Sequence, residues 1–358
     1  MKKIFKNFSE DVNLKDEMDL VIEGEKYIED TNGKDIIIFI GGTQIGKSTT
    51  INALLGVPFK KQKGKLIPQQ ELYTKIGASD NGGVSCTIFP ALYCADHYTY
   101  FLDTQGFFES RNSAIAASSI LMEMAIKDAK SIRIVFLGNY DEIKSGLAKL
   151  DRYNIPLSKL FLNNDIPIFF LWNKFTFGDF DEDFLQDEYL KWDYTKRHNF
   201  IMEQITMKTK EFIKNATINL EKSKEKIEKE YKISLKRYSQ KFKKLISVYD
   251  KQNKENDNYE INKTNADLVE EKIKELEKEN IIIHLIEKSY ESRNFGYFDP
   301  TQEESIHDFY EKIKKCETAK KEDFTYRELS KERINFNENF ERNIYEHTKV
   351  LQKYLFAK

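Results

Sequence analysis

Through about residue 175 the chain alternates short apolar, β-rich runs with longer stretches of mixed polarity, a pattern typical of a parallel sheet covered by helices. Only three residues separate the second apolar run from the third, so these two are predicted to pair as an antiparallel hairpin at one sheet edge. Between and before the runs, the spacing of apolar residues indicates helices at 19–30, 48–55 and 114–130. The expected strands are 36–40, 87–94, 98–103, 132–137 and 167–172.

A second pattern begins at Ile201, where apolar residues recur at steps of three, four or seven as far as Tyr249, with Lys and Glu between them. One long amphipathic helix, on the order of 70 Å at about 1.5 Å per residue, is the simplest interpretation. A helix of that length needs a partner for its apolar face, either a second helix or another chain. The polar run 252–258 ends the helix, and a second helix over 265–278 is predicted to fold back onto it.

The apolar run 281–285 has strand character, and a helical pattern follows it at 302–315. We interpret this run and this helix as a return to the first sheet. The predicted fold is therefore α/β, with a mainly parallel central sheet flanked by helices. Its predicted parts are a domain over 1–180 completed by 281–315, a helical hairpin insertion over 181–280, and a C-terminal helical segment over 316–358.

Composition excludes several classes of protein. The 358 residues carry 57 Lys and Arg against 59 Asp and Glu, a net charge of −2, which argues against a nucleic-acid partner. The three cysteines are too few for a disulfide framework, so a reducing, cytoplasmic location is expected. No apolar run approaches the roughly 18 residues of a membrane span, and neither an export signal nor a lipid anchor is expected. Peripheral membrane contact has no support in the sequence.

The strongest chemical signal is a GxxxxGK[ST] match that stands between the first strand and the following helix. Its glycines allow the loop to curl so that backbone N–H groups face a phosphate, and the helix N-terminus adds partial positive charge. Lys47 is expected to span the β- and γ-phosphates, and Ser48 to hold Mg²⁺. The residues expected to bind the nucleotide here are Gly41, Gly42, Thr43, Gln44, Ile45, Gly46, Lys47, Ser48 and Thr49.

A second element, Asp103-Thr104-Gln105-Gly106, closes the third predicted strand. A carboxylate there can reach Mg²⁺ through water, and the Gly106 N–H can meet the γ-phosphate. The DxxG pattern is weak alone, but its place at the tip of a neighbouring strand strengthens it. Between the two elements, Thr87, or alternatively Ser85, can lend a hydroxyl to Mg²⁺ and the γ-phosphate. The expected metal-binding residues are Ser48, Thr87 and Asp103.

The last predicted strand of this region ends in Asn173-Lys174, and with this element the chain resembles the P-loop GTPases of the translation-factor-related class. That class carries GxxxxGKS, a switch-I Thr, DxxG and [NT]KxD in this order, which agrees over 36–175. The segments 41–55 and 103–108 look most like its large, membrane- or immunity-associated branch, with dynamin-like and septin-like members. The resemblance implies a P-loop G domain that binds Mg²⁺ and GTP, with Asn173 and Lys174 on the guanine base. It also implies dimerisation through the nucleotide face or the helices.

Two residues depart from the pattern of that class. Thr176 stands where the class has the guanine-reading Asp, so the choice between GTP and ATP stays open, with Asp179 as an alternative reader. Phe107 stands where Ras-like enzymes place the water-orienting Gln, so slow intrinsic hydrolysis is expected. Gln44 is a candidate for that role, or else faces solvent, and Arg111 is a candidate charge stabiliser.

The main functional hypothesis is a switch in which Thr87 and Gly106 close on the γ-phosphate and hydrolysis releases them. Lys47, Thr87, Gln44 and Gly106 are the expected catalytic residues, and the helical region would report the nucleotide state to an unidentified protein partner. Two alternatives stay open. One is a self-associating scaffold that holds nucleotide without turning it over, and the other is an ATPase that uses the same loop.

Overall fold

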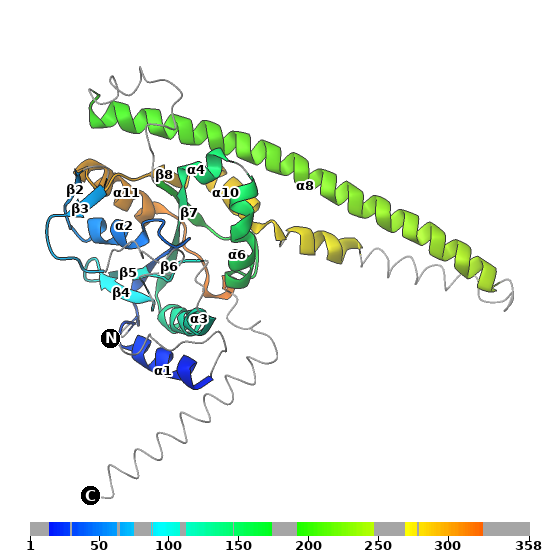
Figure 1. The fold of residues 1–358 in the computed structure, drawn as a ribbon, viewed down its shortest axis with the longest axis horizontal. Helices are drawn as coiled ribbons and strands as arrows, with labels where there is room; N and C mark the ends of the chain where they lie inside the picture. Colours follow the sequence, from blue (N-terminus) through cyan, green and yellow to red (C-terminus); the bar gives the residue numbers. More distant parts are fainter. Residues whose placement is uncertain are drawn as a thin grey trace, which may run out of the picture.

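The computed structural model describes residues 14–28, 31–62, 65–74, 87, 89–107, 112–145, 147–173, 192–246, 269–277 and 279–324. The chain is α/β, and its six-stranded central sheet has the order β4-β5-β1-β6-β7-β8 (Figure 1). Every neighbouring pair is parallel except β4 and β5. The strands are β1 Asp35–Gly41, β4 Ala91–Cys94, β5 Thr99–Asp103, β6 Ser131–Asn139, β7 Ile168–Asn173 and β8 Phe295–Tyr297.

All five predicted strands are present, and β4 and β5 form the predicted antiparallel edge hairpin. β4 begins only at Ala91, so the strand expected over 87–94 is shorter than predicted. A small separate hairpin, β2 Phe59–Gln62 with β3 Lys65–Pro68, was not predicted. At the opposite edge of the main sheet, β8 pairs in parallel with β7, so a late strand joins this sheet, at 295–297 and not at the predicted 281–285. The domain boundaries themselves stay a prediction.

The helices are α1 Leu14–Glu25, α2 Lys47–Leu54, α3 Asn112–Lys127, α4 Tyr140–Lys144, α5 Leu147–Leu150, α6 Asn154–Leu160, α8 Tyr194–Ile246, α10 Ile281–Glu291 and α11 Glu303–Lys315. The first of them ends at Glu25, so the helix expected over 19–30 lies closer to the N-terminus than predicted. A further helical segment at 269–277 lies within the range expected for the second helix of the hairpin. Of the C-terminal helical segment expected over 316–358, residues 316–324 are helical only in a short 3₁₀ turn at Lys321–Asp323, and residues 325–358 lie outside the described residues.

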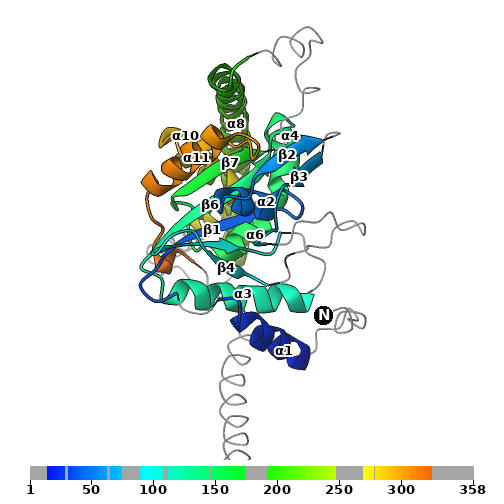
Figure 2. The ribbon, with the colours of Figure 1, turned by 90° about the vertical axis from the view of Figure 1, so that its left-hand side faces the viewer.

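The two faces of the sheet are covered by different helices, as the alternation of side chains along β1 shows. Ile36, Ile38 and Ile40 belong to a core shared with α1, α3, α6 and α10. Ile37 and Phe39 belong to a second core with α2 and α11. Figure 2 shows α1 and α3 together beneath the sheet. Because α2 follows β1 directly, this layering places the loop between them at the carboxyl ends of the strands, where ligands of open α/β sheets bind.

The prediction of a strand at 281–285 is wrong, because these residues open helix α10. A short apolar run does not distinguish a buried strand from a buried helix by its period. Ile281, Ile282, Ile283, Leu285 and Ile286 are all buried, so the packing of this segment outweighs the β preference of isoleucine. The Asn154 Oδ1 atom accepts a hydrogen bond from the Ile282 N–H at 3.0 Å, which satisfies one of the free donors at the helix start.

The long helix α8 spans 53 residues and begins before the predicted Ile201 (Figure 1). Its first half buries Ile205, Phe212 and Ala216 and contacts α4, α10 and β8. An ion pair of 3.1 Å joins Lys224 to Glu277 of the segment 269–277. The apolar face of the first half is thus covered by the part of the chain that carries the sheet. No described helix has both the length and the apolar character needed to cross a lipid bilayer.

Candidate functional site

Four parallel strands end on the same side of the sheet and bring predicted site residues together. β1 leads into the glycine-rich loop, which we define as residues 41–48, and β5 ends at Asp103. β6 ends at Asn139, and β7 ends at Asn173. The carboxyl ends of parallel strands lie on the same side of the sheet, so site residues from distant parts of the sequence come close together here.

The glycine-rich loop has a backbone that few residue types adopt. Gly46 has a φ of 106°, and a Cβ atom there would lie 2.7 Å from the Asn173 Nδ2 atom. Gln44 also has a positive φ of 60° although it carries a side chain. Such a φ is uncommon outside glycine, and at functional sites it occurs where the surrounding structure holds the backbone in place. Gly46 immediately precedes α2, so the loop leads directly into a helix N-terminus.

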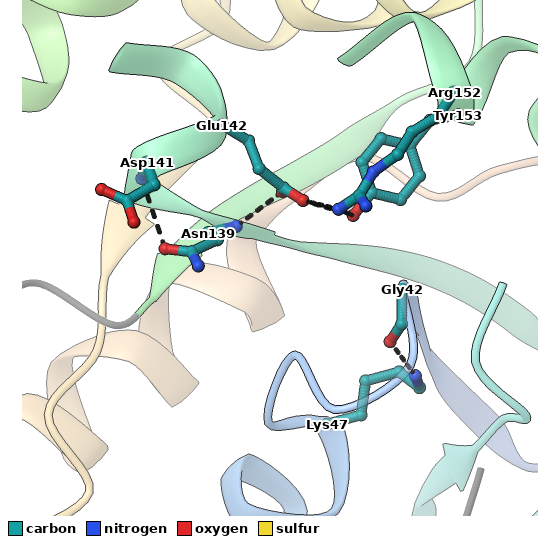
Figure 3. A network of polar contacts seen from close by, with 7 residues as sticks. All are labelled: Gly42, Lys47, Asn139, Asp141, Glu142, Arg152 and Tyr153. Atoms are coloured by element: carbon teal, nitrogen blue, oxygen red, sulfur yellow. Dashed lines mark hydrogen bonds and ion pairs between the residues drawn. The ribbon is translucent and has the colours of Figure 1, made fainter. Parts of the chain in front are cut away.

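Lys47 is buried within the curve of this loop, with 6% of its surface exposed. Its Nζ atom donates to the carbonyl oxygen of Gly42 at 2.9 Å (Figure 3) and to that of Gly41 at 3.2 Å. Burial lowers the pKa of Lys47 to about 8, and the negative charge of Asp103 opposes that shift. The loop therefore holds an ammonium group out of water, where its attraction to an anion is stronger than at the surface.

The three predicted metal-binding residues lie within hydrogen-bonding distance of one another. The Ser48 hydroxyl donates to Asp103 Oδ2 at 2.8 Å, and the Thr87 hydroxyl lies 3.4 Å from both that oxygen and Ser48 Oγ. Asp103 is fully buried, and its Oδ1 atom has no hydrogen-bond partner in the described part of the chain. Burial raises the pKa of the Asp103 carboxyl, while the Lys47 charge and the hydroxyl donors lower it.

This donor set suits a hard divalent cation. Magnesium prefers oxygen ligands and is commonly held by one or two carboxylates together with hydroxyl, water and phosphate oxygens. A buried carboxylate oxygen without a partner is costly, and a bound cation is one explanation for its retention. Within the described ranges, no three His, Cys, Asp or Glu side chains gather into a metal site. The residues present here thus fit Mg²⁺ bound through hydroxyl and carboxylate oxygens.

Gly106 and Phe107 lie directly against the glycine-rich loop. The Phe107 N–H donates to Gly41 O at 2.9 Å, and the Thr43 N–H donates to Phe107 O at 3.2 Å. A Cβ atom at Gly106 would lie 2.6 Å from Thr43 Cα, so this close approach requires glycine. The segment after Asp103 is therefore joined to the loop by backbone hydrogen bonds.

A buried carboxylate network, which the sequence did not predict, follows β6 (Figure 3). Glu142 accepts hydrogen bonds from the Asn139 N–H at 2.8 Å and the Tyr153 hydroxyl at 2.9 Å, and it forms an ion pair with Arg152. Asn139 Oδ1 in turn accepts from the Asp141 N–H at 3.2 Å, which completes a capping box at the start of α4. Burial raises the pKa of Tyr153. The Phe107 ring packs edge-on against Tyr153, with centroids 6.2 Å apart, so this network supports the segment after Gly106.

At the end of β7, the Asn173 Nδ2 atom donates to Ile45 O at 3.2 Å. This bond joins the predicted base-recognition segment to the glycine-rich loop. Lys174, Thr176 and Asp179 lie outside the described residues, so their part in base recognition stays a prediction. The same holds for Ser85 and Arg111.

Two residues at this site were missed by sequence reasoning. The Thr74 hydroxyl donates to Asp103 Oδ2 at 2.9 Å, and Asn52 holds the backbone of Thr74. Asn52 follows Ser48 by one helical turn, so its position on the same face of α2 was available from the sequence. Thr74 belongs to none of the sequence motifs, and only the fold brings it to the site.

No protein-family model matches the chain, and no curated protein is similar enough in sequence to count as a match. The geometry described above is therefore the basis for assigning a function.

Proposed function

We propose that the chain is a Mg²⁺-dependent GTP-binding protein that hydrolyses GTP to GDP and phosphate and uses the reaction as a conformational switch. The observation that carries this proposal is the buried Lys47 inside the glycine-rich loop, with Ser48 hydrogen-bonded across to Asp103 at 2.8 Å. A buried cation beside a helix N-terminus favours a polyanion such as a nucleotide phosphate. The paired hydroxyl and carboxylate supply oxygen ligands for the cation that accompanies such a nucleotide.

Ser48, Thr87 and Asp103 would hold Mg²⁺, which when bound neutralises charge on the phosphates. Lys47 would give up its bonds to Gly41 O and Gly42 O and donate to the phosphate oxygens. Gly106 would contribute its backbone N–H to the γ-phosphate. In phosphoryl transfer the protein contributes mainly positioning and electrostatic stabilisation, and these residues supply both.

We expect hydrolysis to be slow without a partner. Phe107 occupies the position of the water-orienting glutamine, and its ring packs against Tyr153. Gln44 is the candidate for orienting water, since it is exposed in the strained loop beside the phosphate-facing N–H groups. The long helix α8 would report the nucleotide state, through self-association or a protein partner.

Guanine is the proposed base because Asn173-Lys174 resembles the start of the [NT]KxD element, and Asn173 lies at the end of β7 beside the loop, where it donates to Ile45 O. An ATPase is the alternative on this point, since Thr176 replaces the expected aspartate. Competition of unlabelled GTP and ATP against one labelled nucleotide separates the two. Displacement by ATP as effective as by GTP would contradict the guanine assignment.

A scaffold that holds nucleotide without turning it over is the second candidate function. The observation in its favour is Phe107, which lacks any group able to orient water and is tied to the loop by two backbone hydrogen bonds. Binding of GTP without phosphate release, together with nucleotide-dependent self-association, would favour this alternative.

The test of the main proposal is phosphate release from Mg²⁺ and GTP by the wild type and by Lys47→Ala. Lys61→Ala is the matched control, because Lys61 is an exposed lysine on the separate β2–β3 hairpin. We expect release by the wild type and the control and loss of release by Lys47→Ala. Equal release by all three proteins would contradict the assignment of the loop.

A further inference from the structure

We propose that Thr74, held in place by Asn52, is a positioning residue for Asp103 and keeps the Asp103 Oδ2 atom beside the expected cation ligands Ser48 and Thr87. The inference rests on the proposed function and adds to it residues outside the sequence motifs. It concerns a side chain that acts through Asp103 and does not itself touch the nucleotide.

Three hydroxyl groups surround one oxygen of the Asp103 carboxylate. Thr74 is buried, with 4% of its surface exposed, and its hydroxyl donates to Oδ2 at 2.9 Å. Ser48 donates to the same oxygen at 2.8 Å, and Thr87 lies 3.4 Å from it. All three hydroxyls therefore converge on Oδ2, while Oδ1 has no partner in the described part of the chain. The carboxylate thus presents one satisfied and one free oxygen.

Hydrogen bonds from the Asn52 side chain hold the backbone of Thr74 in place. Asn52 is fully buried on α2, and its Nδ2 atom donates to Thr74 O at 2.8 Å and to Ser48 O at 2.7 Å. Its Oδ1 atom accepts from the N–H groups of Tyr73 at 2.8 Å and Thr74 at 3.2 Å. A single amide thus ties the backbone of Thr74 to the helix that carries Ser48.

The hydrogen bond from Thr74 restricts the rotation of the Asp103 carboxylate. The terminal torsion of an aspartate is broad and roughly two-fold, so covalent geometry alone does not hold Oδ2 beside Ser48 and Thr87. Hydrogen bonds to a charged acceptor are stronger than neutral ones, and a rigid donor on Oδ2 keeps that oxygen in place. Of the three hydroxyls, Ser48 and Thr87 are also the expected cation ligands. Thr74 is the donor that remains dedicated to Asp103 when the cation is bound.

The experiment compares Thr74→Val, which removes the hydroxyl at constant shape, with Thr74→Ser, which keeps it. The readout is the release rate of a fluorescent GDP analogue as free Mg²⁺ is varied, which gives the Mg²⁺ midpoint for nucleotide retention. We expect Thr74→Val to raise that midpoint about tenfold, a factor in keeping with the loss of a charge-assisted hydrogen bond. Thr74→Ser should restore the midpoint, and release in excess EDTA should be the same in all variants.

Thr209→Val is the matched control, because Thr209 is equally buried, lies on α8, and its hydroxyl has no partner in the described residues. It should leave the Mg²⁺ midpoint unchanged. A wild-type midpoint in Thr74→Val would overturn the inference. The inference would also be overturned if Thr74→Val released the GDP analogue about tenfold faster than the wild type in EDTA, because that result would indicate a general structural defect. If the wild type shows no Mg²⁺-dependent retention at all, the proposed function fails instead.

A second measurement does not depend on nucleotide. Thermal unfolding of Thr74→Val, Asp103→Asn and the double variant forms a double-mutant cycle. We expect Thr74→Val to lower the melting temperature in the wild-type background and to have a much smaller effect once Asp103 is replaced. Additive shifts would show that Thr74 does not act through Asp103 and would overturn the inference.

Discussion

Replacement of Lys47 by methionine is expected to stabilise the nucleotide-free protein although it abolishes nucleotide binding. The side chain is buried, and its pKa falls from the ordinary value of 10.5 to about 8 because burial penalises the ammonium group. At about 1.4 kcal/mol per pH unit, this difference corresponds to a cost of about 3 kcal/mol for carrying the charge into the fold. Methionine has a similar shape and no charge, so it avoids that cost.

One loss offsets part of the gain. Gly41 O still accepts from the Phe107 N–H, whereas Gly42 O loses the Lys47 donor, at a cost of about 1 kcal/mol. The attraction between Lys47 and Asp103 is already contained in the pKa of about 8, so it is not subtracted a second time. We therefore expect a net stabilisation of about 2 kcal/mol for Lys47→Met, measured by urea unfolding at pH 7 without nucleotide.

The free energy of unfolding is also expected to depend on pH through Lys47. Above pH 8 the folded protein releases the Lys47 proton, while the unfolded chain keeps it up to about pH 10.5. The unfolded state binds more protons in this window, so the contribution of Lys47 to stability rises with pH. The free energy of unfolding of the wild type should therefore rise relative to that of Lys47→Met between pH 8 and pH 10.5. A lower stability of Lys47→Met at pH 7, or a constant difference over that window, would refute the reasoning.

Two further substitutions test other buried polar groups. Thr209→Val should stabilise the fold by about 1 kcal/mol, because it removes a buried hydroxyl without a partner in the described residues, and a thermal unfolding curve measures it. Glu142→Ala should destabilise it by about 2–4 kcal/mol, because the Asn139 N–H and the Tyr153 hydroxyl lose their buried acceptor. Chemical unfolding measures that loss, and a change below about 0.5 kcal/mol would contradict the structural role given to Glu142.

The elements that could be predicted from the sequence are those specified by local patterns. Residues 36–40 of β1 are a run of buried apolar residues, and the glycine-rich loop and α2 follow this strand directly, so the apolar pattern and the neighbouring motif agree. The pairing of β4 with β5 follows from their short connection. The convergence of Ser48, Thr87 and Asp103 was also expected, because strand ends meet at one edge of a parallel sheet.

The elements that could not be predicted depend on contacts between distant segments. The run 281–285 opens a helix whose apolar side chains are buried, and the period of a run of five residues does not show whether it is a helix or a strand. Thr74 reaches Asp103 only because Asn52 holds its backbone, and no sequence spacing indicates that contact. The Glu142 network joins β6 to Arg152 and Tyr153 through the tertiary fold, although the capping box Asn139–Glu142 is itself a local pattern.

The central claim is that the glycine-rich loop binds a guanine nucleotide with Mg²⁺ through Lys47, Ser48 and Asp103. Equilibrium binding of labelled GTP to the wild type and Lys47→Ala, in Mg²⁺ and in EDTA, tests it most directly. We expect binding by the wild type that weakens at least tenfold in EDTA, together with a comparable or larger loss in Lys47→Ala, since one charge-assisted contact accounts for that factor. Equal affinity of both proteins, or no binding by the wild type, would contradict it.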